Sequence, residues 1–450
     1  MRAQIPLSGE RPEADTDATR EAGSRLPASG EDRARAYGMV ATPPEIVEFM
    51  VGLCEPSVAG PLDVLEPACG DAPFLRAFVA RYGMRHDLTG VDIHAAETRL
   101  AQAQMPTAHF LDTDYLLWET EQRFDIIIGN PPYGIIGDAS HYPIHTLREH
   151  KALYKKRFAT WFGKYNIYGA FIEQSVRLLK PEGKAVLVVP ATWLVLDDFA
   201  RLRAFLAHSG KVTIYYLGKA FPKRNVSAVV LVLAKGERGL ELYDGMERAV
   251  SKQEYRGEII RFETPDAVAF ERSGIPLGEC FRVHFAARSP EIRKHPSVVT
   301  APREGCVPIL TGRNLQRGRI DYETCYSGLW MPREDAPQLR AFYASPHIVV
   351  AHTKGTRVVA AVDWRCYPWR EEFHLVPLVG IPDLDALVGY LNSDEVQHYT
   401  RALYRDFVPH LTATMLKVLP IPRKLIAMQA EIQLSLWRNG DHGQPYTGAF

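Results

Sequence analysis

The sequence is organised around one stretch, residues 124–134, which reads FDIIIGNPPYG. Its first five residues are mostly apolar and β-branched, so they predict a buried strand, and the Gly, Asn and two Pro residues that follow end it abruptly. In a parallel α/β sheet, ligands bind at the carboxyl ends of the strands. The polar residues of this stretch are therefore expected to face a binding site.

The residues after this strand, Asn130-Pro131-Pro132-Tyr133, suit a substrate with a planar amino group. The lone pair of such a nitrogen is delocalised, which makes it a poor nucleophile. The Asn130 side-chain oxygen and the Pro131 carbonyl are acceptors that can pull it towards a tetrahedral, nucleophilic geometry. The Tyr133 ring can stack on the ring that carries the amino group. The alternative is a strand that simply ends in a proline-stiffened turn.

The composition is that of a globular protein: 450 residues, 46% of them hydrophobic. We find no apolar run of membrane-spanning length and expect no export signal. The six cysteines form no CxxC pair, so no metal site is predicted and a cytoplasmic location is expected. Lys and Arg number 53, as do Asp and Glu, which argues against nonspecific coating of nucleic acid but leaves room for a local basic groove.

Strands and helices alternate through the first half of the chain. This pattern predicts a doubly wound, mostly parallel, seven-stranded α/β sheet. The expected strands are residues 62–66, 89–93, 110–115, 124–128, 184–190, 212–217 and 226–234. Before them, Thr42 is expected to be the N-cap of a helix, with Pro43 at its first position and Glu45 completing a capping box.

Acidic residues stand at the ends of three of these strands, at Glu66, Asp92 and Asp114. A tight loop at residues 67–73 follows the first, and the helix after it offers N–H groups to a carboxylate. Asp92 can accept bonds from ribose hydroxyls, and Asp114 from an adenine amino group. Single acids at strand ends are often only solvated, but three in succession before Asn130 favour a site for an adenosyl cofactor.

From residue 263 onwards, short strands, prolines and late helices predict a mixed α+β region. Two polar loops stand out, residues 311–314 (TGRN) and residues 352–357 (HTKGTR), the second as a hairpin tip between 348–351 and 358–362. Arg suits guanine edges, Asn suits adenine edges and Lys suits phosphate. The candidate DNA-binding residues are Arg313, Asn314, Lys354 and Arg357.

We therefore expect four segments. Residues 1–36 are predicted to be a disordered tail, 37–262 a catalytic domain, 263–424 a target-recognition domain and 425–450 a C-terminal tail. A basic and aromatic stretch, residues 141–168, follows the central motif and is either a solvated helix face or a phosphate contact.

The chain resembles the gamma-class adenine-N6 DNA methyltransferases, in particular the Taq I-type enzymes that methylate adenine in TCGA. The likeness runs from about Tyr37 to Pro422 and is most specific in residues 130–134 (NPPYG), 190–196 (PATWLVL), 310–315 (LTGRNL), 351–361 (AHTKGTRVVAA) and 404–412 (YRDFVPHLT). The resemblance implies the class I S-adenosylmethionine-dependent methyltransferase fold, followed by a DNA-recognition domain.

The resemblance also implies site residues. S-adenosyl-L-methionine is expected to contact Thr42, Glu66, Ala68, Asp92, Ile93, Asp114, Tyr115, Asn130, Pro132 and Phe171. The flipped adenine is expected to meet Asn130, Pro131, Tyr133 and Phe221, with Pro132 completing the catalytic motif, and Pro409 is expected to lie in the duplex near the gap left by that adenine.

The function expected is that of a monomeric, site-specific adenine methyltransferase of a restriction–modification system, which acts on double-stranded DNA without an obligate protein partner or a membrane. One alternative is an amino-group methyltransferase that acts on RNA or on a protein glutamine; the large region after residue 262 favours DNA. The other is a catalytically silent, sequence-specific DNA-binding protein, and the intact Asn-Pro-Pro-Tyr motif argues against it.

Overall fold

The computed structural model describes residues 41–55, 60–137, 143–144, 147–221, 227–352 and 354–426. The tail predicted for residues 1–36 lies outside the described residues, as does all but the first two residues of the tail predicted for 425–450. Within the described ranges, no helix is long and apolar enough to cross a membrane, and no cluster of three metal-ligating side chains occurs.

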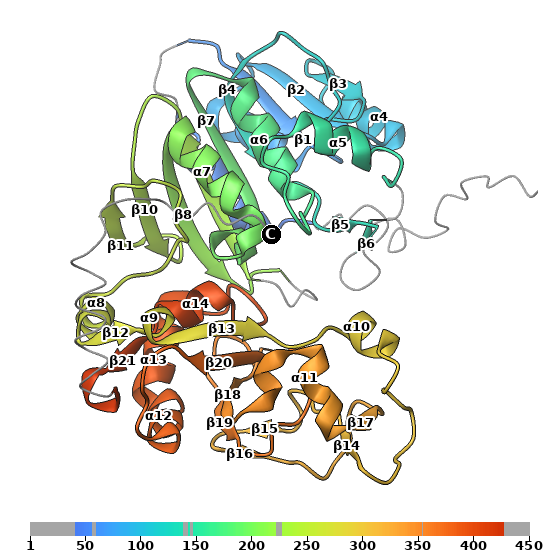
Figure 1. Ribbon diagram of the computed structural model, residues 1–450. Helices are drawn as coiled ribbons and strands as arrows, with labels where there is room; N and C mark the ends of the chain where they lie inside the picture. Colours follow the sequence, from blue (N-terminus) through green and yellow to red (C-terminus); the bar gives the residue numbers. More distant parts are fainter. Residues whose placement is uncertain are drawn as a thin grey trace, which may run out of the picture.

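A nine-stranded sheet forms the centre of the N-terminal half, in the order β11-β10-β8-β9-β7-β4-β1-β2-β3 (Figure 1). Its strands are β1 (Asp63–Pro67), β2 (Asp87–Asp92), β3 (His109–Asp112), β4 (Phe124–Gly129), β7 (Leu179–Pro190), β8 (Lys211–Gly218), β9 (Ala228–Ala234), β10 (Leu240–Asp244) and β11 (Arg248–Gln253). Strands β3, β2, β1, β4 and β7 run parallel, and β9 pairs antiparallel with both β7 and β8. This confirms the predicted class I methyltransferase fold, whose seven strands are extended at one edge by β10 and β11.

Helices cover both faces of the sheet (Figure 1). They are α2 (Pro44–Gly52), α3 (Pro73–Tyr82), α4 (Ala95–Gln104), α5 (Lys151–Arg157), α6 (Tyr168–Leu178) and α7 (Ala200–Ser209). In β4, Ile126 and Ile128 pack into the core formed with α2 and α3, whereas Ile127 packs into the core formed with α6 and α7. The apolar run of this strand follows from its burial on both faces.

The N-terminus of α2 differs from the prediction. The helix begins at Pro44, and its N-cap is Pro43, which offers no side-chain acceptor. Thr42 is therefore not the N-cap, and the expected capping box does not form. The Thr42 hydroxyl instead accepts a hydrogen bond from the Asn130 side-chain amide at 3.0 Å. The sequence Thr42-Pro43 predicts a helix N-cap because proline is common at the first position of a helix.

The C-terminal half has mixed α+β structure. Its main sheet is antiparallel, with the order β13-β20-β18-β19, and smaller two-stranded sheets surround it. The strands are β12 (Gly274–Pro276), β13 (Phe281–Phe285), β14 (Cys306–Pro308), β15 (Leu315–Gln316), β16 (Arg319–Ile320), β17 (Trp330–Pro332), β18 (His347–Val350), β19 (Ala360–Asp363), β20 (Phe373–Pro377) and β21 (Pro420–Pro422). The helices are α8 (Pro265–Arg272), α9 (Leu277–Cys280), α10 (Ser289–Lys294), α11 (Ala336–Leu339), α12 (Leu384–Leu391), α13 (Asp394–Tyr404) and α14 (Ala413–Lys417). The predicted hairpin is present, since β18 pairs with β19.

The two halves contact each other through the segment that follows α13 (Figure 1). The Phe407 ring packs against Tyr216 of β8 and against Phe262. The Arg405 guanidinium lies over the ring of Phe262 and forms an ion pair of 3.2 Å with Asp244 of β10. The large sheet ends at Gln253 and α8 begins at Pro265, so residue 262 remains our proposed boundary.

Candidate active site

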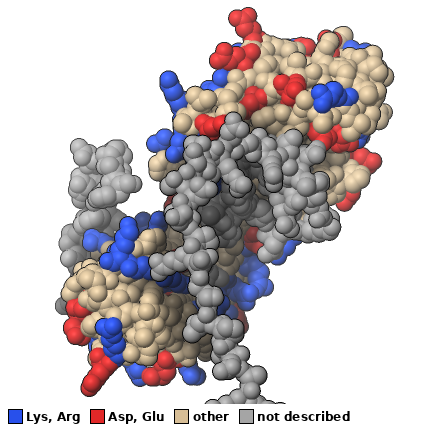
Figure 2. All heavy atoms as spheres, turned by 90° about the vertical axis from the view of Figure 1, so that its right-hand side faces the viewer, with Lys and Arg blue, Asp and Glu red and all other residues tan. Residues whose placement is uncertain are grey.

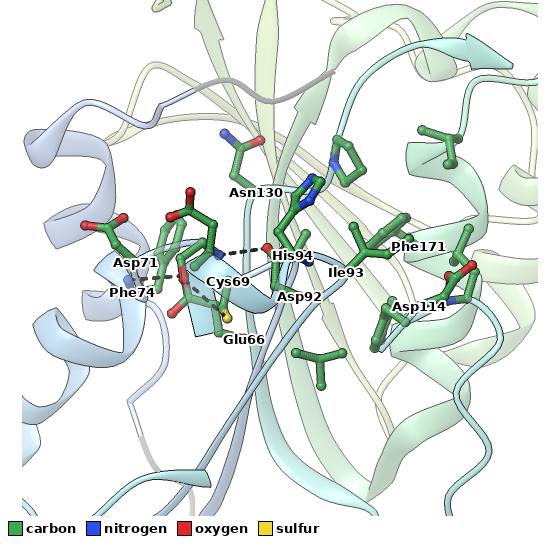
Figure 3. A pocket seen from close by; sticks show the side chains of 18 of the residues that line it. Glu66, Cys69, Asp71, Phe74, Asp92, Ile93, His94, Asp114, Asn130 and Phe171 are labelled. Carbon is green, nitrogen blue, oxygen red and sulfur yellow. Dashed lines mark hydrogen bonds between the residues drawn. The ribbon is translucent and has the colours of Figure 1, made fainter. Parts of the chain in front are cut away.

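A cavity of about 320 Å³ opens at the carboxyl edge of β1, β2 and β4. It is lined by Ala41, Thr42, Glu66, Ala68, Cys69, Gly70, Asp71, Pro73, Phe74, Val91, Asp92, Ile93, His94, Glu97, Asp114, Tyr115, Leu116, Asn130, Pro132, Leu147, Tyr154, Ile167 and Phe171. The structure thus brings all ten predicted cofactor residues around one cavity. Figure 3 shows Glu66 and Asp114 towards opposite ends, with Asp92 between them.

Glu66 is the penultimate residue of β1 and lies buried under the first turn of α3. Its carboxylate accepts the backbone N–H groups of Phe74, at 3.4 Å, and of Leu75, at 2.8 Å. Burial raises the pKa of Glu66 well above its ordinary value, although these two bonds oppose the shift. The helix N–H groups expected to meet a ligand carboxylate are therefore occupied by the protein's own Glu66.

The loop between β1 and α3 bends sharply around the cavity. Ala68, Gly70 and Ala72 all have left-handed backbone conformations, with φ of 51°, 52° and 59°. Asp92, at the end of β2, fixes this loop because its carboxylate accepts the N–H of Gly70 at 2.9 Å. Its other oxygen accepts the N–H of His94 at 2.9 Å. Carboxylate oxygens have further lone pairs, so Asp92 retains acceptor capacity towards the cavity.

Asp114 is held from three sides. Its Oδ1 accepts the N–H of Leu116 at 2.9 Å, and its Oδ2 accepts the Tyr154 hydroxyl at 2.5 Å and lies 3.1 Å from the His150 ring. Burial and the nearby Asp114 carboxylate raise the pKa of Tyr154, so the phenol remains a donor. Tyr154 and His150 were not predicted, because only the fold brings α5 next to Asp114.

Two aromatic rings line the part of the cavity near Asp114. Tyr115 and Phe171 stack with ring centroids 5.1 Å apart and an interplanar angle of 28°. The Tyr115 hydroxyl lies 3.0 Å from the Ser175 hydroxyl of α6, and its burial raises the pKa of the phenol. A flat apolar wall beside an acceptor suits the ring and amino group of an adenine.

Asn130 follows β4 directly and borders the cavity together with Pro132 (Figure 3). The next residues are fixed by α6 and the loop before it. The N–H of Gly134 donates to the Asn166 side chain at 2.8 Å, and the Gly134 carbonyl accepts the N–H of Ile167 at 2.9 Å. The Pro-Pro-Tyr segment is therefore held at both ends, by the sheet and by residues 166–167.

Tyr133 and Phe221 are brought together, as the resemblance implies. Their ring centroids are 6.3 Å apart, but the rings are perpendicular, at 89°. A base stacked between two rings needs them parallel and about 7 Å apart, so one ring must turn for both to stack on it. The Tyr133 hydroxyl donates to the Val188 carbonyl at 3.1 Å, which fixes this ring through β7.

Three of the predicted DNA-binding side chains, Arg313, Lys354 and Arg357, are exposed on the C-terminal half, and so is Pro409. The loop at 352–357 contacts the segment around Pro409. The N–H of Gly355 donates to the Pro409 carbonyl at 3.2 Å, and the N–H of Leu411 donates to the His352 carbonyl at 3.1 Å. In Figure 2, Lys and Arg gather on the part of the C-terminal half that lies next to the N-terminal half.

Asn314 is a correction to the sequence prediction. Its side chain is fully buried, accepts the N–H of Thr311 at 2.9 Å and donates to the carbonyls of Asp321 and Thr324 at 2.8 Å. These bonds occupy its amide group, so it shapes the loop and presents nothing to a base. A sequence motif does not distinguish this role from base reading, because both use the same amide.

Glu372, which was not predicted, lies beneath the two polar loops. Its carboxylate accepts the N–H of His352 at 2.5 Å and is also hydrogen-bonded to the backbone of Gly312. Burial raises its pKa to about 8 in spite of these bonds. One buried carboxyl group thus joins the loop that carries Arg313 to the loop that carries Lys354.

Comparisons with known proteins agree with both halves. Residues 88–220 match the Eco57I restriction-modification methylase family, and residues 307–421 match the TaqI-like C-terminal specificity domain. A type II methyltransferase of Thermus thermophilus is 57% identical over 402 residues, which cover 87% of this chain and 92% of that protein.

Two more distant similarities cover a smaller share of this chain. The type II methyltransferase M.BstVI of Geobacillus stearothermophilus is 27% identical over 235 residues, 42% of this chain and 40% of that protein. Among solved structures, a nuclease-deletion mutant of the Type ISP restriction-modification enzyme LlaGI, in complex with a DNA substrate mimic, matches with a TM-score of 0.50 and 10% identity. The match covers 77% of this chain and 50% of that one, and it bears on the fold alone.

We predict that Tyr154→Phe weakens the binding of S-adenosylmethionine several-fold. The change removes the hydroxyl that orients the Asp114 carboxylate, while the ring still fills its place; a hydrogen bond to a charged group contributes about 1.5–3 kcal/mol. Isothermal titration calorimetry measures the effect. Tyr326→Phe, at an exposed position, is the control. Equal affinity of the two variants contradicts a role of Tyr154 in holding Asp114.

We also predict that Glu372 makes stability depend on pH. A carboxyl group whose pKa is raised on folding stabilises fully below its ordinary value of 4.5, and this contribution is lost as the pH rises through about 8. The free energy of unfolding of Glu372→Gln, relative to that of the natural chain, should therefore increase from pH 5 to pH 8. Urea unfolding at both pH values measures the difference, with the exposed Glu304→Gln as control. A difference that does not change with pH contradicts the raised pKa.

Proposed function

This chain belongs to the TaqI-like type II DNA methyltransferases, and on that premise we propose that it methylates the N6 amino group of adenine in duplex DNA, within the sequence TCGA. S-adenosylmethionine is its cofactor and supplies an activated methyl group. The chain serves as the modification enzyme of a restriction–modification system. We propose that it acts as a monomer, because the cofactor cavity, the catalytic motif and the specificity domain lie in one chain.

The observation that supports the adenine chemistry best is the position of Asn130. This residue borders the cofactor cavity, and three residues later the chain reaches Tyr133, whose ring lies beside Phe221. A base that stacks on Tyr133 has its exocyclic amino group near the Asn130 side chain and the Pro131 carbonyl. These groups accept its two N–H bonds and direct the nitrogen lone pair towards the cavity.

The amino group of adenine is paired inside the duplex, so the base must leave the stack to reach Asn130. Flipping a base costs a few kcal/mol, which stacking on Tyr133 and Phe221 partly offsets. Thr42 orients the Asn130 amide through their hydrogen bond of 3.0 Å. The protein then acts mainly by positioning the amino group and by stabilising the positive charge that develops on it.

Site selection is proposed to lie in the C-terminal half. The exposed Arg313 is suited to a guanine edge, and Lys354 and Arg357 to phosphates or bases, while Pro409 is placed by the loop that carries Lys354. Contacts with phosphates set the register on the duplex, and contacts with base edges read the sequence.

The product tests this function. Duplex DNA that contains one TCGA site, incubated with the chain and labelled S-adenosylmethionine, is expected to yield N6-methyladenine at that site, measured by mass spectrometry of the digested DNA. A duplex with the central bases exchanged, TGCA, is the control and is expected to remain unmodified. Methylcytosine as the only product, or equal methylation of both duplexes, contradicts the proposal.

We predict that Asn130→Ala lowers the single-turnover rate of methyl transfer by about 10²–10³, the range observed when one group that stabilises a transition state is removed. The variant loses an acceptor aimed at the amino group. Asn130→Asp keeps an oxygen at this position and is expected to retain more of the rate. Rapid-quench measurements with saturating DNA and cofactor compare the two. A near-normal rate for Asn130→Ala shows that Asn130 is not catalytic.

A further inference from the structure

A second cavity, of about 300 Å³, lies beside the catalytic motif and does not belong to the cofactor site. It is lined by Ile135, Gly137, Lys151, Trp161, Gly163, Lys164 and Tyr165. One wall contains β5 (Ile135–Ile136), which directly follows the Asn-Pro-Pro-Tyr-Gly motif, and the other is the segment between α5 and α6. Figure 1 shows β5 on the side of the N-terminal half that is turned towards the C-terminal half.

The lining of this second cavity is cationic. Lys151 and Lys164 both line it, and among the residues that the structure describes no Asp or Glu does. A third cation is close, because the Arg148 Nε lies 3.6 Å from the point where a Cβ would stand on Gly137. The Asp198 carboxylate lies behind Gly163 and accepts the N–H of Lys164 at 3.3 Å, and its negative charge offsets only part of this positive charge. Such a site favours an anion.

The second cavity also has hydrogen-bond donors to offer. The Lys151 ammonium donates one bond to the Ile136 carbonyl at 2.5 Å, which fixes its position and leaves two further N–H groups. Trp161 is 7% exposed, and its indole N–H has no acceptor among the described residues. A buried donor without an acceptor costs about 1–3 kcal/mol, so an oxygen-rich ligand close to it gains affinity.

Hydrogen bonds connect the walls of the second cavity to the catalytic motif. Both of the hydrogen bonds that hold Gly134, to Asn166 and to Ile167, connect the two chain segments that form its walls. An anion held between these walls therefore acts on the segment that positions Pro132 and Tyr133. A ligand that links the site to catalysis in this way is expected to be part of the substrate.

We propose that this second cavity binds a backbone phosphate of the DNA strand that carries the flipped adenine. The inference rests on the proposed function, since it assigns the anion to the nucleic-acid substrate. A phosphodiester carries one negative charge and acceptor oxygens, which match two lysines and an N–H donor. The contact anchors the strand beside Tyr133, so that the extruded nucleotide is held by its backbone as well as by its base.

The test uses the full chain and a TCGA duplex labelled with a fluorophore. Lys164→Gln and Lys151→Gln are each expected to weaken binding roughly three- to ten-fold at low salt and to reduce the slope of log K against log salt by about one unit. Lys156→Gln, an exposed lysine of α5 that lies outside the cavity lining, is the control and should leave the slope unchanged. Fluorescence anisotropy across a salt series measures affinity and slope.

Neutral methylphosphonate linkages, placed one at a time around the target adenine, then locate the contact. In the natural chain, one or two positions on the adenine strand should weaken binding, and in Lys164→Gln the same positions should have little further effect, because the contact is already lost. A site for a free phosphate ion would show no such dependence on the DNA backbone.

The proposal is overturned if both cavity variants keep the slope of the natural chain, or if every methylphosphonate weakens the natural chain and Lys164→Gln alike. Because these readouts measure binding, they do not depend on which base is methylated. A chain that binds through this second cavity but yields no N6-methyladenine refutes the proposed function and leaves the phosphate site standing.

Discussion

The parallel pairing of β4 with β1 on one side and β7 on the other is the constraint on which the site depends. Val64 pairs with Ile126 and Leu65 with Ile127, while Gly129 pairs with Leu187 of β7. Successive residues of β4 face different cores, so a slip of one residue would place each side chain on the wrong face. This fixed register is what brings Glu66 and Asn130 to the same edge of the sheet.

Buried and half-buried polar side chains fix loops that follow the strands. In each case a side chain from one element accepts the backbone N–H of another: Asp92 for Gly70, Asn166 for Gly134, and Glu372 for His352. Burying such a group is unfavourable unless it is hydrogen-bonded, and the N–H groups supply those bonds. The loops of the cofactor cavity, the catalytic motif and the C-terminal half are thus held by the same kind of hydrogen bond, which explains how irregular segments keep a defined geometry.

The sequence predicted the features that depend on neighbouring residues in the chain, such as buried strands and the polar residues at their ends. The apolar runs predicted the central strands, and the acids at or near their ends predicted part of the lining of the cofactor cavity. It could not predict Tyr154 or His150, because only tertiary packing brings them to Asp114. It wrongly made Thr42 the N-cap of α2, although Thr42 lines the cofactor cavity as predicted. It also wrongly made Asn314 a base-reading residue, because the same amide can serve its own loop or face a ligand. The cofactor loop also showed a weak signature, because Ala68 and Ala72 adopt left-handed conformations in which glycine is usual.

A net charge of zero is compatible with binding DNA because the charges are unevenly distributed. Lys and Arg gather on the C-terminal half where it lies next to the N-terminal half, and acidic side chains are prominent elsewhere on the surface (Figure 2). The proposed base site is closed, since the rings of Tyr133 and Phe221 contact each other edge to face. A base that enters must replace this ring contact with its own stacking, which is favourable only if the duplex is already held. Holding the backbone on both halves before the base arrives therefore couples recognition of the site to formation of the base pocket.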